Sequence, residues 1–119
     1  MKEDNPLKDK SYQFAIRIVK FYKYIVENKK EFVLSKQVLR SGTSIGAMVE
    51  EANQAESKAD FIHKLSIANK EANETFYWLR LLKDSEIAGS EIEPLLNNCS
   101  ELVRLLTSII KSTKRNLSK

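Results

Sequence analysis

The side chains best suited to acid–base, nucleophilic or metal chemistry are few in this sequence of 119 residues. It contains one histidine, His63, and one cysteine, Cys99. A disulfide within the chain and a zinc site with two cysteines are therefore excluded. Only Asp60 and His63 have the acid-x-x-His spacing of a di-metal helical bundle, and that site needs a second histidine. We expect no metal, no cofactor and no catalytic residue, and the chain is not predicted to be an enzyme.

Two glycines resemble a functional motif but favour a structural interpretation. Gly42 and Gly46 have small-xxx-small spacing, and no Gly-Lys-Ser/Thr follows them as in a phosphate-binding loop. Each glycine costs about 1 kcal/mol relative to alanine inside a helix. We therefore expect a neighbouring backbone to pack closely there, or the helix to bend. Cys99 falls at an apolar position of its helical repeat and is expected to be buried, whereas His63 faces outward.

Apolar residues recur at steps of three and four in four stretches, at about residues 11–28, 33–55, 57–83 and 90–112. Three glycines and two prolines are too few for the turns of an all-β fold. Four helices joined by short polar breaks predict an all-α, antiparallel up-down-up-down four-helix bundle. We expect a single domain over residues 1–119, with an ordered core at about 11–112 and frayed termini.

Helix ends and outward apolar residues give further expectations. Ser57 and Asp60 have the spacing of a capping box at the start of the third helix. In the second helix, the repeat assigns these residues to the core: Leu34, Val38, Ser41, Ile45, Met48, Ala52 and Ala55. In the third helix, the stripe opposite the core is His63, Ile67, Lys70, Glu74, Tyr77 and Leu81. Outward apolar side chains indicate an oligomer interface, with these candidates: Ile16, Tyr24, Ile67, Tyr77, Trp78 and Leu81.

The net charge of +4 hides a strong segregation along the chain. Residues 1–40 carry +5, residues 41–101 carry −6, and residues 102–119 carry +5. In the predicted bundle the first and fourth helices are neighbours, so we expect one basic edge on which Lys8, Lys10 and Arg17 meet Lys111, Lys114 and Arg115. The acidic residues Glu50, Glu51, Glu56 and Asp60 are expected at the same end, on the far edge.

Two interpretations of the basic edge stay open. In the first, it neutralises phosphates, and the candidate nucleic-acid contacts are Arg17, Lys20, Lys23, Lys111, Lys114 and Arg115. In the second, it meets the acidic edge of the next subunit in a head-to-tail contact that can close into a ring. No stretch approaches about 18 apolar residues, and no apolar segment follows the N-terminus, so we expect a cytoplasmic protein without membrane contact.

Three stretches carry a family resemblance: residues 39–47, 60–68 and 70–82. They resemble small bacterial four-helix-bundle proteins named for reading frames inside intervening sequences of 23S rRNA genes, also labelled S23 ribosomal proteins. The resemblance covers about residues 12–110. Relatives of that family include the accessory variability protein of diversity-generating retroelements, a basic pentamer that binds nucleic acid and a reverse transcriptase. The resemblance therefore implies a homopentamer and no catalytic motif.

Together these observations predict a non-catalytic, homo-oligomeric bundle that binds RNA or associates with rRNA through its basic edge. The alternative is a protein–protein adaptor, or an accessory subunit for a partner enzyme such as a reverse transcriptase, without direct contact to nucleic acid. Possible partners are thus RNA, DNA or another protein, besides further copies of the chain itself.

Overall fold

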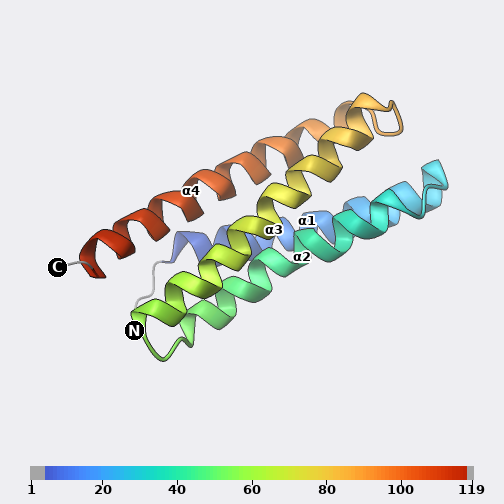
Figure 1. Ribbon diagram of the computed structural model, residues 1–119. Helices are drawn as coiled ribbons and strands as arrows, with labels where there is room; N and C mark the ends of the chain where they lie inside the picture. The colour runs from blue at the N-terminus through green and yellow to red at the C-terminus, as the bar shows by residue number, and fades with distance from the viewer. Residues whose placement is uncertain (1–4, 118–119) are drawn as a thin grey trace.

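The computed structural model describes residues 5–117, which form four α-helices and no strand (Figure 1). The helices are α1 (Pro6–Tyr24), α2 (Leu34–Asn53), α3 (Lys58–Asp84) and α4 (Glu93–Leu117). A π turn (Ile25–Lys29) follows α1, and a 3-10 turn (Ser90–Ile92) precedes α4. Successive helices run in opposite directions within a rod of 51 × 24 × 21 Å. The predicted all-α, antiparallel four-helix bundle is confirmed.

Helix α1 begins at Pro6, earlier than the start expected near Ser11. The side chain of Asn5 accepts a hydrogen bond from the backbone N–H of Lys8 at 3.1 Å, which caps the helix. Pro6 occupies the first turn, where its missing N–H removes no helical hydrogen bond. The added turn brings Leu7 into the core, where it is buried.

Helix α4 also extends further than expected. It continues to Leu117, past the fraying predicted from Thr113 onward. Ile109 and Ile110 pack against the buried core, and the Thr113 hydroxyl donates a hydrogen bond to the Ile109 carbonyl at 2.8 Å. Apolar packing thus extends along α4 to Ile110, and the helix continues into the basic residues that follow.

The starts of the two central helices are capped in different ways. The Ser57 hydroxyl accepts a hydrogen bond from the Asp60 N–H at 3.1 Å, which confirms the predicted cap of α3. At the start of α2, the Glu31 carboxylate is the cap. It accepts hydrogen bonds from the N–H groups of Val33, Leu34 and Ser35 at 2.8–3.0 Å. Desolvation raises the pKa of Glu31, but these backbone donors outweigh it and the pKa lies below its usual value.

The core of α2 differs partly from the expected repeat. Val38, Ser41, Ile45 and Ala52 are buried as expected, and Val49 is buried as well. The other expected core residues, Leu34, Met48 and Ala55, are only half-buried. A strict 3.5-residue repeat drifts by about 20° per heptad along a straight helix, so the core face moves from Met48 to Val49, and Ala55 lies beyond the end of α2.

Helices α1, α2 and α3 are joined by close contacts. Gly42 faces α1, and a Cβ atom there would lie 2.9 Å from Ile18 Cγ1. Toward α3, the Thr75 hydroxyl donates to Ser41 Oγ at 2.8 Å in the interior. The expected close approach of a neighbouring backbone is found at Gly46, where a Cβ atom would lie 3.3 Å from the Ser11 carbonyl oxygen. By contrast, α4 packs more extensively on α3 than on α1, and this leaves the α1–α4 edge open.

Candidate nucleic-acid interface

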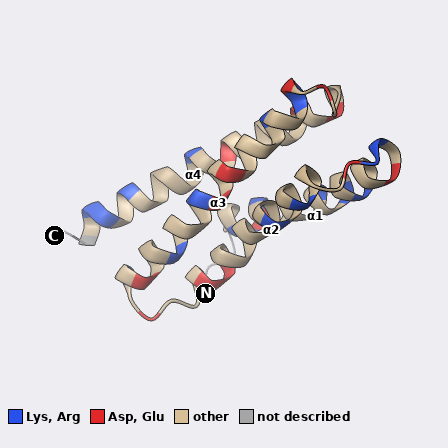
Figure 2. Cartoon of the chain, turned by 45° about the vertical axis from the view of Figure 1, so that its right-hand side comes forward, with Lys and Arg blue, Asp and Glu red and all other residues tan. Residues whose placement is uncertain are grey.

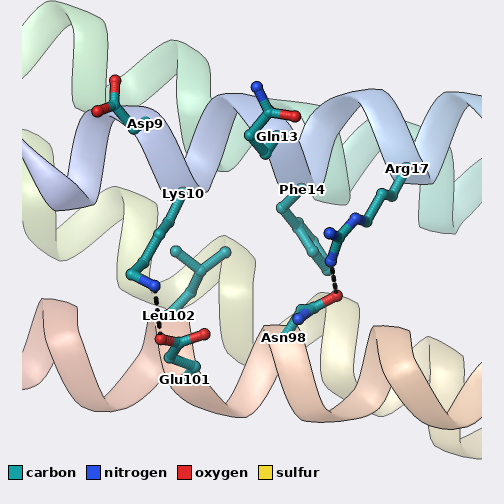
Figure 3. Close-up of a pocket in the computed structure, with 8 residues that line it drawn as sticks. All are labelled: Asp9, Lys10, Gln13, Phe14, Arg17, Asn98, Glu101 and Leu102. Carbon is teal, nitrogen blue, oxygen red and sulfur yellow. Dashed lines mark hydrogen bonds and ion pairs between the residues drawn. The ribbon is translucent and has the colours of Figure 1, made fainter.

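The seam between α1 and α4 contains a hollow with a volume of 290 Å³ (Figure 3). The buried side chains of Phe14 and Leu102 line its base. Across the seam, Lys10 Nζ lies 2.8 Å from Glu101 Oε2, and Arg17 Nη1 donates to Asn98 Oδ1 at 2.6 Å. The lysine lowers the pKa of Glu101, so this ion pair stays charged at neutral pH.

These two contacts fix the register of α1 against α4. Pro6 lies beside Leu105 and Ser108, so the last turns of α4 extend past the start of α1. The expectation that the basic residues of the two helices meet is therefore wrong. It concerned Lys8, Lys10 and Arg17 on one helix and Lys111, Lys114 and Arg115 on the other. Lys8 instead lies 4.0 Å from Glu50 Oε1 on α2.

The candidate phosphate contacts fall into two groups on this edge. The α1 cluster consists of Arg17, Lys20 and Lys23, and the α4 cluster consists of Lys111, Lys114 and Arg115, all exposed. Arg17 lies beside Asn98, and the rise of 1.5 Å per residue places Lys111 about 20 Å further along α4. Each cluster spans about one to two turns of its own helix, and the α4 cluster lies beyond the start of α1.

Several of these cations have no acidic partner. Within residues 5–117, no carboxylate lies within ion-pair distance of Lys20, Lys23, Lys111 or Arg115. Elsewhere, Lys64 lies 2.9 Å from Glu51 and Lys83 lies 2.8 Å from Glu93, whereas Lys58, Lys70 and Arg80 of α3 have no ion pair within the described residues. The α1–α4 edge therefore presents positive charge that the described part of the chain does not neutralise.

The expected acidic residues gather at the α2–α3 end (Figure 2). An open hollow there is lined by Glu50, Glu51, Gln54, Glu56, Asp60 and Lys64. Basic residues mark the C-terminal end of α4, so the charges segregate between parts of the surface. This arrangement keeps both interpretations of the basic edge open.

The candidate oligomer residues lie on more than one face. Ile67, Trp78 and Leu81 are half-buried, and their spacing places them on the same flank of α3 as Glu71 and Glu74. Those two carboxylates pair with Arg40 of α2. Tyr77 is exposed, with its ring centroid 5.2 Å from that of Trp78. The remaining candidates lie on α1: Ile16 on its outer face and Tyr24 on its α4 side.

The residues with the strongest intrinsic chemistry lie apart from the seam. His63 is exposed on α3. Cys99 is fully buried, its thiol donates to the Ala72 carbonyl at 3.2 Å, and burial raises its pKa to about 12. The described residues contain no group of three or more His, Cys, Asp or Glu side chains that could hold a metal ion. Nor does any helix among them have the length and apolar character needed to cross a membrane.

The sequence did not identify the α4 residues that shape the seam. Asn98 and Glu101 bind Arg17 and Lys10, and neither was a candidate. The sequence indicates only that Asn98 and Glu101 lie three residues apart, at the edge of the apolar repeat of α4. Their partners on α1 can be identified only when the register of α1 against α4 is known. That register follows from packing of the bundle and not from the local sequence pattern.

The fold and this seam define a small all-α bundle with a partly unneutralised basic edge. Over residues 3–108 the sequence matches the 23S rRNA-intervening sequence protein family, so the chain belongs to this family. A crystal structure of a protein of unknown function from the S23 ribosomal protein family of Bacteroides thetaiotaomicron is 59% identical. The similarity covers 88% of this chain and 98% of that one, with a TM-score of 0.86. No curated protein matches the chain.

Proposed function

We propose that this protein is a non-catalytic, homo-oligomeric RNA-binding protein whose α1–α4 edge contacts phosphates. The observation that carries this proposal is a set of cations that have no acidic partner among residues 5–117: Lys20, Lys23, Lys111 and Arg115. An isolated cation on the surface contributes little to stability. When it binds a phosphate, it releases counterions that are condensed on the nucleic acid, and this release favours binding. The family name refers to intervening sequences of 23S rRNA genes, which makes RNA the first nucleic acid to test.

The spacing of the clusters favours contact with an extended strand. The α1 and α4 clusters lie about 20 Å apart on one edge, with Arg104 and the Lys10–Glu101 pair between them. Contacts of this type position a nucleic acid without reading its sequence. A ring of subunits would repeat the edge around its axis and add further phosphate contacts. The family resemblance favours five subunits.

A second candidate function is a protein–protein adaptor or accessory subunit of a partner enzyme. The observation that favours it is exposed aromatic surface away from the basic edge, since Tyr77 is 51% exposed beside Trp78. Tyrosine and tryptophan are enriched at protein interfaces. The same surface would also serve contacts between copies of this chain, which is the assignment we favour.

Filter binding of RNA and of DNA separates the two functions. Phosphate contacts predict an affinity that falls steeply between about 50 and 200 mM salt. An adaptor that does not contact nucleic acid would retain neither RNA nor DNA on the filter at the lower salt concentration, and that result would overturn the proposal. A shift in oligomeric state with salt, without nucleic-acid binding, would instead assign the basic edge to a neighbouring subunit.

A further inference from the structure

A second hollow lies on the α1–α4 seam, next to the α1 cluster. It has a volume of 330 Å³ and is lined by Arg17, Lys20, Phe21, Tyr24, Glu91, Pro94 and Leu95. Like the hollow at the α2–α3 end, it is shallow and open to solvent. Phe21 and Leu95 are buried and form its apolar base, whereas Tyr24 is 38% exposed at its wall.

Charge is distributed unevenly around this hollow. Arg17 and Lys20 lie on the α1 side, and Lys20 has no carboxylate partner within residues 5–117. Glu91 lines the hollow from the 3-10 turn that precedes α4, and its carboxylate accepts a hydrogen bond from the Gly89 N–H at 3.0 Å. That hydrogen bond lowers the pKa of Glu91, so the carboxylate is negative at neutral pH. A phosphate is attracted to the α1 side and repelled from Glu91.

We propose that this hollow holds one unpaired base of a single-stranded nucleic acid, stacked on the Tyr24 ring, with its phosphates on Arg17 and Lys20. This inference rests on the proposed function and deepens it, because it names single strands as the substrate class. Aromatic rings beside basic side chains are the usual elements of single-strand binding sites, since every base has a π face. A duplex keeps its bases stacked and cannot supply one to Tyr24.

Charge complementarity favours a nucleic acid over an apolar segment of another protein. An apolar side chain in the hollow would remove water from Arg17 and Lys20 without giving either cation a partner. A nucleotide avoids this cost. Its base would cover the apolar base of the hollow at Phe21 and Leu95, and its phosphate would pair with the two cations. The sequence indicated Tyr24 as a subunit contact, and the hollow reassigns it to the nucleic-acid edge.

The test is binding of a fluorescein-labelled oligouridylate and of a blunt RNA duplex to the full chain. Tyr24→Ala is expected to weaken oligouridylate binding about tenfold, in line with the loss of one stacked base. It should leave duplex binding and the salt dependence unchanged, because no charge is removed. Tyr24→Phe keeps the ring and should bind like the wild type. Tyr12→Ala is the matched control, since Tyr12 is 62% exposed on α1 and does not line the hollow.

Circular dichroism and light scattering of each variant complete the test. A folded Tyr24→Ala variant that binds oligouridylate as tightly as the wild type would overturn the base site and leave phosphate binding in place. A variant with unchanged RNA affinity but a smaller oligomer would return Tyr24 to the subunit interface and also overturn it. Failure of the wild type to bind any nucleic acid would overturn the proposed function itself.

Discussion

Glu31 shows how one side chain outside the helical repeat determines where a helix begins. Its carboxylate accepts hydrogen bonds from the N–H groups of Val33, Leu34 and Ser35, and the Ser35 hydroxyl donates to the Glu31 carbonyl at 2.8 Å. These N–H groups have no partner within the helix, and a negative charge at that end also interacts favourably with the helix dipole. The four-residue segment between the π turn and α2 is thereby connected to the helix start.

We predict that Glu31→Gln lowers the free energy of unfolding at neutral pH by about 1 kcal/mol, the usual effect of a lost cap. The folded-state pKa of Glu31 lies below the unfolded value, so its contribution is complete above the unfolded pKa and disappears as the pH falls through the folded pKa. Urea denaturation should therefore separate the variant from the wild type at neutral pH and not in acid. Glu27→Gln, at an exposed carboxylate of the π turn, is the control and should match the wild type at both pH values. An equal effect of both substitutions would contradict the capping role.

Gly42 offers a second residue-level prediction, in which two effects oppose each other. Alanine is favoured over glycine inside a helix by about 1 kcal/mol. The added Cβ, however, would lie 2.9 Å from Cγ1 and 3.0 Å from Cγ2 of Ile18, which is fully buried. Overpacking of this type costs about 1–3 kcal/mol, so Gly42→Ala should be destabilising overall.

The sign of the Gly42 effect should reverse when the obstructing side chain is removed. In an Ile18→Ala background both γ carbons are absent, and Gly42→Ala should then stabilise the protein relative to Ile18→Ala alone. Thermal unfolding of the four proteins of this double-mutant cycle measures the coupling. Additive effects in the cycle would show that the contact between α1 and α2 is not what requires glycine at this position.

At the level of helices, the sequence predicted the number, direction and type of the elements, because the apolar repeat is a local property. The cap of α3 at Ser57 was predicted for the same reason. The start of α1 was missed, since Asn5 and Pro6 are as typical of a loop as of a helix start. The end of α4 was missed because the packing of Ile109 and Ile110 outweighs the polar composition of the last turns.

The candidate site was predicted less completely than the helices. The basic residues of this edge can be identified from the sequence. The distance of about 20 Å between the two clusters, calculated from the helical rise, depends on the register of α4 against α1. Asn98 and Glu101 set that register, and only the packed bundle reveals their partners Arg17 and Lys10. The hollow beside Tyr24 likewise needs α1 and the start of α4 together.

The outer face of α3 carries the prediction about assembly. Tyr77 is exposed and lies next to the half-buried Trp78 and Leu81, so a charge there would be buried in an interface without a partner. We predict that Tyr77→Glu reduces the molecular mass measured by light scattering to that of a smaller species. Tyr12→Glu, at an exposed tyrosine of α1, should keep the wild-type mass. A monomeric wild type would refute the interface directly.

At the level of the whole molecule, the net charge of +4 is less informative than where the charges lie. Carboxylates neutralise Lys8, Lys10, Arg40, Lys64 and Lys83, whereas several cations of the α1–α4 edge have no such partner within the described residues. The net charge calculated from the sequence does not distinguish cations that have a carboxylate partner from cations that have none. Cations that contact phosphates displace the counterions condensed on the nucleic acid, and a cation without a carboxylate partner is available for this contact.

The most direct test of this account is the salt dependence of RNA binding when the α4 cluster is reversed. The variant Lys111→Glu, Lys114→Glu, Arg115→Glu is compared with a control of equal net charge, Lys58→Glu, Lys70→Glu, Arg80→Glu, whose positions are exposed on α3. For single strands the slope of log K against log salt changes by about 0.7 per phosphate contact, so three lost contacts reduce it by about 2. We predict this reduction, with weaker binding, in the α4 variant and a smaller change in the control. Equal slopes in the α4 variant and the wild type would contradict phosphate binding at this edge.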